Sequence, residues 1–242
     1  MPLRPATYAD LLPASIVMAS AFKDEVLFGQ ALHPHREQYP DDMYLYFLRL
    51  LRLAYYSSPD EHIILSTTND DTIIGVANWT RKRAVKRKGS LYCQAMAKAM
   101  ASYNAAEALV YPNRAADPSM ADVLERMDPF TKHYWTGSRA ESWYLNLLGV
   151  DPAHGGKGAG RELVQWGFSR AREEGVGCSV IAALGREKFY ERCGYDVTVG
   201  KAGALGGERN PLRDIQGGTI IFWDGGKPVT GLEEYKEEEE QG

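Results

Sequence analysis

The stretch YLNLLGVDPAHGGKGAGRELVQWGF, residues 144–168, combines residue types that suit the binding of a phosphate. An apolar run typical of a strand ends at Val150, Asp151 and Pro152 follow, and four glycines then precede a helical pattern. Glycines let a backbone approach a ligand closely, and the free N–H groups at a helix start point at it. The sequence therefore predicts an anion-binding turn, to which Lys157 adds a positive charge.

The spacing of the glycines separates this turn from two common phosphate-binding loops. A P-loop would need a glycine at Asp151 and a hydroxyl residue at Gly158. A dinucleotide-binding fingerprint would need a glycine where Arg161 stands. Both are therefore disfavoured, and a purely structural entry into the helix remains the alternative at this point.

Composition narrows the class of protein. The 242 residues carry a net charge of −4, which gives no overall reason to expect nucleic acid as a partner. Three cysteines without metal-ligand spacing predict neither a disulfide framework nor a metal site, and no apolar run is long enough for a membrane span. We expect a cytoplasmic protein, and the basic run at residues 81–88 keeps nuclear import as an alternative.

The elements that must position the turn alternate between strand and helix. Strand patterns occur at the N-terminus, in the pair HIILSTT and TIIGVANWT, and again before and after the turn, with helical patterns between them. Residues 81–135 look like a helical insertion, and no linker divides the chain. We expect one α/β domain over residues 1–230, and an acidic, disordered tail over residues 231–242.

With these neighbours the turn resembles the acyl-CoA loop of the GNAT acetyltransferase superfamily, [Q/R]-x-x-G-x-[G/A]. That pattern maps onto Gly155, Gly156, Lys157, Gly158, Ala159 and Gly160. The segments LRPATYADL, LNLLGVDPAH and GREKFYERCGYDV also look like segments of this family. The resemblance implies a mixed central sheet of about seven strands flanked by helices, and it is weakest over residues 81–135 and 200–218.

The resemblance implies acetyl-CoA as a co-substrate that enters between two parallel strands. These strands would separate near Val150 and Leu184, and Leu148, Gly149 and Val150 would offer main-chain groups to the pantetheine arm. The N–H of Val150 would polarise the thioester oxygen. Gly155 departs from the family pattern, which has Gln or Arg there, so Lys157 or Arg161 would have to replace that contact.

Direct transfer to an amine needs a group that accepts a proton and a group that donates one. The resemblance makes Tyr190 the acid for the departing thiolate, whereas a core position for this ring is the alternative. Tyr144 and Asn146 alternate with Leu148, so we expect all three on one strand face toward the acceptor. No base is assigned; the candidates that could border the acceptor are Asp24, Glu25, His33, His35, His133 and Glu141.

The acceptor is expected to be a small-molecule amine, because the pattern looks closest to acetyltransferases of the puromycin acetyltransferase type. An aromatic pocket for it could come from the insertion and the strand before it, namely from Trp79, Tyr103, Tyr111, Tyr134 and Trp135. The alternatives are a protein or peptide N-acetyltransferase and a non-catalytic acyl-CoA-binding protein. No acyl-cysteine intermediate is expected, and the oligomeric state is left open.

Overall fold

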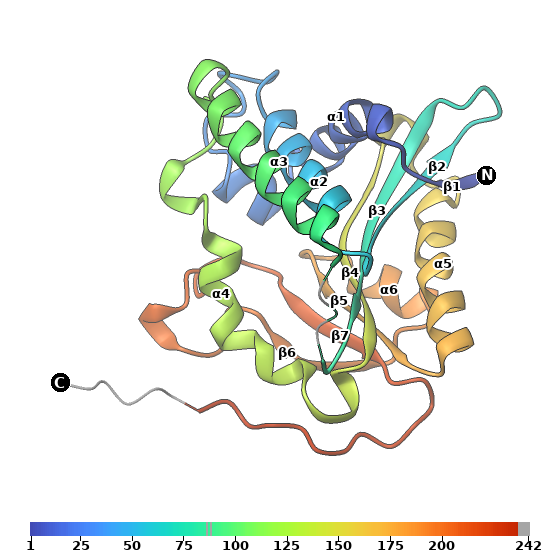
Figure 1. Cartoon of the computed structure of the whole chain (residues 1–242). Helices are drawn as coiled ribbons and strands as arrows, with labels where there is room; N and C mark the ends of the chain where they lie inside the picture. Colours follow the sequence, from blue (N-terminus) through green and yellow to red (C-terminus); the bar gives the residue numbers. More distant parts are fainter. Residues whose placement is uncertain (86, 88, 237–242) are drawn as a thin grey trace.

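One mixed sheet organises the described part of the chain, which comprises residues 1–85, 87 and 89–236 of this computed structural model. Its seven strands run in the order β1-β2-β3-β4-β5-β7-β6 (Figure 1), which agrees with the mixed sheet of about seven strands that the resemblance implied. The strands are β1 Leu3–Pro5, β2 Glu61–Thr67, β3 Ile73–Lys82, β4 Ser142–Val150, β5 Gly177–Ala182, β6 Val197–Lys201 and β7 Thr219–Trp223. The helices are α1 Leu11–Phe22, α2 Tyr44–Ser57, α3 Leu91–Val110, α4 Val123–Thr131, α5 Ala159–Glu174 and α6 Glu187–Cys193.

Strands β4 and β5 are the parallel neighbours of this sheet, and their pairing is short. It runs from Ser142 opposite Gly177 to Leu145 opposite Val180, and the remaining neighbours pair antiparallel. β4 continues to Val150 without β5 beside it. The edge of β4 beyond Leu145 is therefore open toward β5, which is the separation expected near Val150.

Helices cover both faces of the sheet (Figure 1). On one face α5 packs against β3 and β4, where Leu163, Val164 and Phe168 meet the indole of Trp79 and neighbouring apolar residues. On the other face α1 and α2 bury Met18, Phe47 and Leu51 against β2, β3 and Leu147 of β4. Each helix presents one apolar stripe to the sheet, as amphipathic sequence patterns require.

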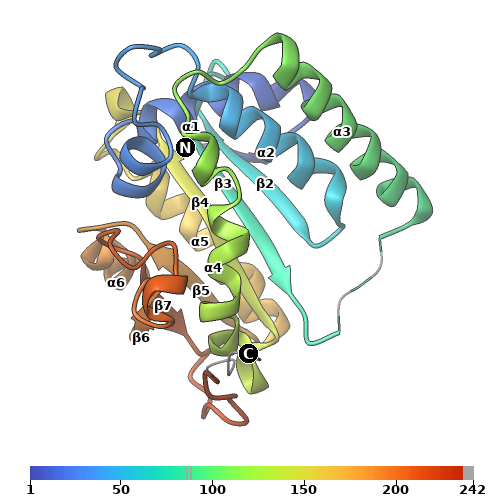
Figure 2. The same cartoon turned by 90° about the vertical axis from the view of Figure 1, so that its left-hand side faces the viewer.

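The helical segment between β3 and β4 lies beside α2 and then returns to the sheet. α3 begins at Ser90, whose hydroxyl accepts the N–H of Cys93, and it contacts α2 through ion pairs of Glu107 with Arg49 and Arg52. Figure 2 shows α4 running between the group α1–α3 and the end of the sheet that holds β6 and β7. Neither α3 nor any other helix of the described residues is both long and apolar enough to span a membrane.

Two charged segments of the sequence lie partly outside the described residues, namely Lys86 and Lys88 of the basic run and residues 237–242 of the acidic tail. Within the basic run, Arg81 is buried and paired with Glu141 and Glu174. Before residue 237, the N–H of Glu233 bonds to Thr136 and Tyr235 packs on Phe130 and His133. The segment just before residue 237 therefore packs along the end of the helical insertion.

A close contact between α5 and β3 predicts a specific loss of stability. A Cβ at Gly167 would overlap the indole of Trp79, whereas at Gly160 of the same helix it would lie 3.4 Å from Phe189. We expect Gly167→Ala to lower the free energy of unfolding by about 1–3 kcal/mol through overpacking. Gly160→Ala should instead raise it by up to about 1 kcal/mol, because alanine favours helix. Urea unfolding measures both, and equal effects would contradict the role of this contact.

Candidate functional site

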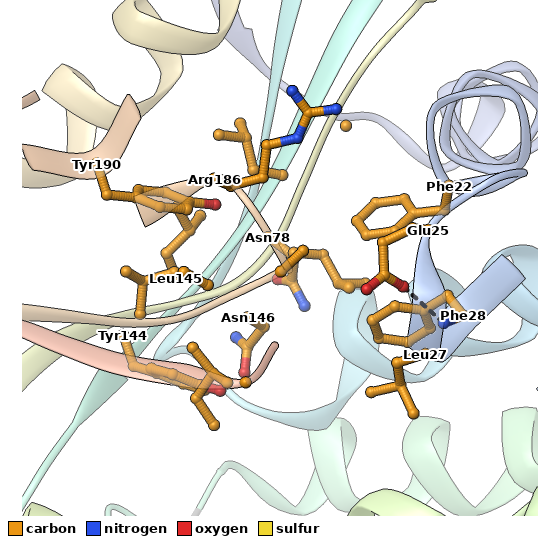
Figure 3. A pocket seen from close by; sticks show the side chains of 18 of the residues that line it. Phe22, Glu25, Leu27, Phe28, Asn78, Tyr144, Leu145, Asn146, Arg186 and Tyr190 are labelled. Atoms are coloured by element: carbon orange, nitrogen blue, oxygen red, sulfur yellow. Dashed lines mark hydrogen bonds between the residues drawn. The ribbon is translucent and has the colours of Figure 1, made fainter. Parts of the chain in front are cut away.

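A large cleft opens where β4 and β5 separate (Figure 3). Its volume is about 1850 Å³, and it reaches from the glycine turn past the strand ends to α4. The walls come from α1 and the residues after it, from β3 and β4, and from α6. Tyr190 and Glu25 line opposite sides of the close-up view, with Asn78 and Asn146 between them (Figure 3). The cleft therefore joins the glycine turn to a chamber that contains titratable groups.

The glycine turn has the backbone geometry of an anion-binding helix start. Gly156 and Gly158 have φ angles of +73° and +94°, which residues with a Cβ rarely adopt, and nothing lies within 4 Å of a Cβ at either position. Gly158 caps α5, and the N–H of Glu162 bonds to the Gly158 carbonyl at 3.0 Å. Among the described residues, the N–H groups of residues 156–161 meet no protein acceptor. They are available to a ligand.

Positive side chains line the cleft, in part at positions that the sequence did not single out. Arg161, Arg186 and Arg192 line the cleft, whereas Lys157 does not. None of the three arginines has a carboxylate partner within the part of the chain that the structure describes. Arg186 and Arg192 lie on both ends of α6, far from the turn in sequence. Only the fold brings them to the cleft, so no local motif could have indicated them.

Main-chain groups of β4 are also turned toward the cleft. The N–H of Asp151 bonds to the carbonyl of Ile74 on β3 at 2.9 Å. In an antiparallel pair, every second residue of a strand bonds to the neighbouring strand through its main chain. The N–H of Gly149, two residues before Asp151, therefore points at β3, whereas the N–H groups of Leu148 and Val150 point away from β3. That other side is the edge from which β5 has departed. Leu148 and Val150 therefore present free N–H groups there, whereas the N–H of Gly149, which the resemblance also assigned to the pantetheine arm, is turned toward β3.

A β-bulge in β4 changes which side chains share a face. Asn78 pairs with Leu147 and Trp79 with Leu145, so Asn146 is the extra residue. Leu145 and Leu148 pack in the core under α5, and Leu147 packs in the core under α1 and α2. The prediction that Tyr144, Asn146 and Leu148 share one face is therefore wrong for Leu148. A strict period of two holds only for a strand without an inserted residue.

Tyr144 and Tyr190 both turn their hydroxyl groups into the cleft (Figure 3). Tyr190 is only 8% exposed, and burial raises its pKa well above the ordinary value of 10. Burial likewise raises the pKa of Tyr144. Both phenols thus keep their protons at neutral pH and are able to donate them. The thiols of Cys178 and Cys193 are buried, which raises their pKa values and disfavours a nucleophilic thiolate.

Four polar side chains, Glu61, Asn78, Thr80 and Asn146, form what we term the polar row. Glu61 pairs with Thr80 across β2 and β3, and Thr80 pairs with Tyr144 across β3 and β4. The Thr80 hydroxyl donates to Glu61 at 2.6 Å and accepts the Asn146 amide at 2.5 Å. Burial raises the pKa of Glu61, while hydrogen bonds from Thr80 and Asn78 oppose that shift. The sequence analysis missed Glu61, although the register of the predicted hairpin would have placed it opposite Thr80.

The six candidate bases divide clearly by position. Asp24 and Glu25 line the cleft. Glu25 accepts the N–H of Phe28 at 2.7 Å, and burial raises the pKa of its carboxyl. The other four, His33, His35, His133 and Glu141, do not line the cleft. His33, for example, is fully buried between the carbonyl of Phe28 and the amide of Asn113, which is a structural position.

The aromatic pocket expected from the insertion is wrong for most of its members. Of its five aromatic residues only Trp135 lines the cleft, where it packs edge-to-face against Tyr144. Trp79 faces α5 and is fully buried, and Tyr103 and Tyr111 are exposed on the outside of the molecule. The aromatic walls come instead from the end of α1, from the segment after α1 and from α6, namely from Phe22, Phe28, Phe189 and Tyr190.

The wall made by α1 is held close to β4 by a glycine. A Cβ at Gly149 would lie 2.6 Å from the sulfur of Met18 and 3.1 Å from Ala21. Because no side chain intervenes, α1 lies directly on the strand at this point. The helix leads at once into the segment that carries Asp24 and Glu25. Gly149 therefore fixes the distance of these carboxyl groups from β4.

Comparison with known proteins agrees with this arrangement. Residues 123–195 match the model of the acetyltransferase (GNAT) family. A Corynebacterium glutamicum structure, described as histone acetyltransferase HPA2 and related acetyltransferase, is 18% identical, with 95% of this chain and 96% of that chain covered and a TM-score of 0.56. Arylalkylamine N-acetyltransferase 2 of Aedes aegypti is 12% identical (92% and 98% covered, TM-score 0.53). The polyamine N-acetyltransferase of Drosophila melanogaster is 15% identical (92% and 99% covered, TM-score 0.52). At these identities the likeness concerns the fold.

The buried carboxyl of Glu61 predicts a pH-dependent contribution to stability. Burial raises its folded pKa above the ordinary 4.5, so its stabilising contribution is complete below that pH and is lost as the pH rises through the folded pKa. Glu61→Gln stays neutral, so its free energy of unfolding should increase relative to wild type from about pH 4 to pH 7. Urea unfolding across this range measures the difference.

Asp10 provides a control of opposite sign for this measurement. The hydrogen bond from Arg4 holds its pKa below the ordinary 3.8, so its contribution is present above that pH and is lost as the pH falls. Asp10→Asn should therefore lose stability relative to wild type as the pH rises from about pH 2 to pH 4, and should differ from wild type by a constant amount above that range. A flat difference for Glu61→Gln above pH 4, beside a sloping one for Asp10→Asn below pH 4, would contradict the raised pKa of Glu61.

Proposed function

Because the chain carries an acetyltransferase (GNAT) domain and uses acetyl-CoA as its co-substrate, we propose that it acetylates the amine of a small molecule by direct transfer. The observation that carries this proposal is the cleft between β4 and β5, which joins the glycine turn to a chamber with aromatic and carboxyl walls. α4 borders that chamber with Leu124, Met127 and Asp128. Walls on several sides suit a small acceptor better than an extended peptide.

The glycine turn is the proposed site of the coenzyme A diphosphate. The free N–H groups of residues 156–161 and the positive end of α5 favour an anion there. Arg161, Arg186 and Arg192 add positive charge along the same wall. Gly155 occupies the position of the family's Gln or Arg, and in this chain these arginines would supply the missing charge.

The direction of the coenzyme follows from the position of the turn after β4. With the diphosphate beyond Val150, the pantetheine arm runs back along the open edge, and the thioester lies farthest from the turn. The N–H of Val150 would then bond to the pantetheine arm, and the N–H of Leu148 would polarise the thioester oxygen. This revises the sequence-based hypothesis, which gave that role to Val150. One such N–H contributes about 2.7–4 kcal/mol to lowering the barrier.

Glu25 and Tyr190 are the proposed base and acid. The Glu25 carboxylate, with a pKa raised by burial, accepts the proton of the attacking amine. The amine nitrogen forms a bond to the thioester carbon, the carbon–sulfur bond breaks, and the coenzyme A thiolate takes the proton of Tyr190. Tyr144 and Asn146 would orient the amine at the bulge, where both face the cleft.

The turn can be tested by binding alone. An alanine at Gly158, where φ is +94°, is strained and displaces the neighbouring N–H groups. Hydrogen bonds to a charged group are worth about 1.5–3 kcal/mol, so the Kd for coenzyme A should rise by about tenfold or more. Titration calorimetry measures it. Gly155→Ala is the matched control, because φ there is −60° and alanine adopts it freely. Equal Kd values for the two variants would place the coenzyme elsewhere.

The function is tested by incubating acetyl-CoA with a panel of amines and following the release of free thiol. We expect turnover of small amines, and a loss of about 10²–10⁴-fold in kcat for Tyr190→Phe and for Glu25→Gln, the usual contribution of acid–base catalysis. Glu25→Gln should also remove the acidic limb of the pH profile of kcat/KM. This limb should lie above pH 4.5, because burial raises the pKa of Glu25.

Tyr195→Phe is the matched control for the acid. Tyr195 packs against Tyr190 with ring centroids 5.6 Å apart, but it is buried in the core and does not line the cleft. Its loss of a hydroxyl should leave kcat close to that of wild type. Full activity of Tyr190→Phe would refute the acid assignment. Binding of acetyl-CoA without turnover of any amine would favour the non-catalytic alternative, and turnover of peptides alone would favour the peptide acetyltransferase.

A further inference from the structure

The polar row is a further set of functional groups in the cleft, on elements other than those that carry Tyr190 and Glu25. Its members come from β2, β3 and β4, whereas Glu25 follows α1 and Tyr190 belongs to α6. All four members line the cleft. Asn78 and Asn146 point into the space between the two walls (Figure 3). The row is thus in reach of the part of an acceptor molecule that does not react.

The polar row leaves one buried hydrogen-bond acceptor without a partner. The Thr80 hydroxyl donates its hydrogen to Glu61, and the Asn146 amide donates one of its hydrogens to Thr80. Asn78 is only 3% exposed, and its side-chain oxygen has no partner among the described residues. A buried carbonyl without a partner is rare, because its desolvation is not repaid by a hydrogen bond. The side-chain oxygen of Asn78 and the Glu61 carboxylate can therefore both accept a hydrogen bond from a donor group of a ligand.

We propose that the polar row binds a second hydrogen-bond donor of the acceptor, an ammonium or a hydroxyl group, so that the enzyme prefers bifunctional amines to simple monoamines. This inference rests on the proposed function and adds the substrate class. The donor bonds to the side-chain oxygen of Asn78 and to the carboxylate of Glu61. An ammonium gains more than a hydroxyl, because its hydrogen bond to a carboxylate is charge-assisted.

The rival second group is a carboxylate, because a lysine lies beside the row. The Lys82 ammonium lies 4.8 Å and 4.9 Å from the ring centres of Trp135 and Tyr144. It is also close enough to Glu61 to oppose the rise of that carboxyl's pKa. A ligand carboxylate would approach Glu61 itself and would leave the oxygen of Asn78 without a donor. The orphaned oxygen therefore favours a donor group over a carboxylate.

The test compares four acceptors of equal chain length: butylamine, the diamine putrescine, the amino alcohol with a terminal hydroxyl, and the amino acid with a terminal carboxylate. We expect kcat/KM for putrescine to exceed that for butylamine by about tenfold or more, with the amino alcohol between them and the amino acid below butylamine. Ratios near one for both donors, or a preference for the carboxylate, would overturn the proposal.

Substitutions in the row then identify its contribution. Glu61→Gln and Asn78→Leu should each bring the putrescine-to-butylamine ratio toward one. The ratio is taken within each variant, so that a general loss of activity cancels. Asp128→Asn is the matched control, because it removes another carboxylate that lines the cleft but lies outside the row; its ratio should remain that of wild type. Loss of the ratio in Asp128→Asn alone would assign the preference to α4 instead.

A binding measurement separates failure of this inference from failure of the proposed function. Titration calorimetry with coenzyme A present needs no turnover, and putrescine should bind about tenfold more tightly than butylamine, a difference that Glu61→Gln removes. Tight putrescine binding without thiol release would refute the transferase while supporting the site. Thiol release from both amines with equal binding and equal kcat/KM would refute the site alone. If Asn78→Leu does not fold, circular dichroism reveals it, and Glu61→Gln, which keeps the side-chain volume, decides.

Discussion

The separation of β4 from β5 is the constraint on which the rest of the structure depends. Their pairing ends at Leu145 and Val180, but β4 runs on to Val150. A strand edge without a neighbour leaves main-chain groups unpaired, which a protein normally avoids inside its sheet. Here the open edge borders the cleft. The same strand leads into the glycine turn, so the free N–H groups of the edge and those of the turn follow one another along a single wall.

The bulge at Asn146 divides β4 into two functional parts. Before it, Tyr144 faces the acceptor chamber and Leu145 faces the core; after it, Leu147 faces α1 and α2, and Leu148 takes the place in the core under α5. One inserted residue thereby gives the strand two adjacent side chains, Asn146 and Leu147, on the face of the cleft. The polar row exists because Asn146 reaches Thr80 from this position.

Sequence reasoning succeeded where local chemistry decides and failed where register decides. The turn at residues 155–160 was predicted from its glycines, and Tyr190 from its motif, because both signals lie within a few residues; the structure places both at the cleft, while their roles stay predictions. The strand and helix order followed from periodicity, and the family resemblance supplied the mixed sheet. Glu61, Arg186 and Arg192 were missed because strand pairing and a helix carry them to the cleft from distant parts of the chain. The face of Leu148 was predicted wrongly because a bulge shifts it, and the location of Trp79 because a contact with α5 buries it. Neither the bulge nor the contact leaves a local signal in the sequence.

The contact of Gly149 with Met18 has a consequence for engineering this cleft. The side of the chamber that carries Glu25 is packed against the sheet at a glycine, where an added Cβ would overlap Met18 and would have to push α1 or its side chains away. α4 differs from α1, because it belongs to the long segment between β3 and β4. It lines the same cleft with Leu124, Met127 and Asp128. Attempts to reshape the acceptor preference should therefore diversify the α4 side and leave the α1 side as the fixed reference.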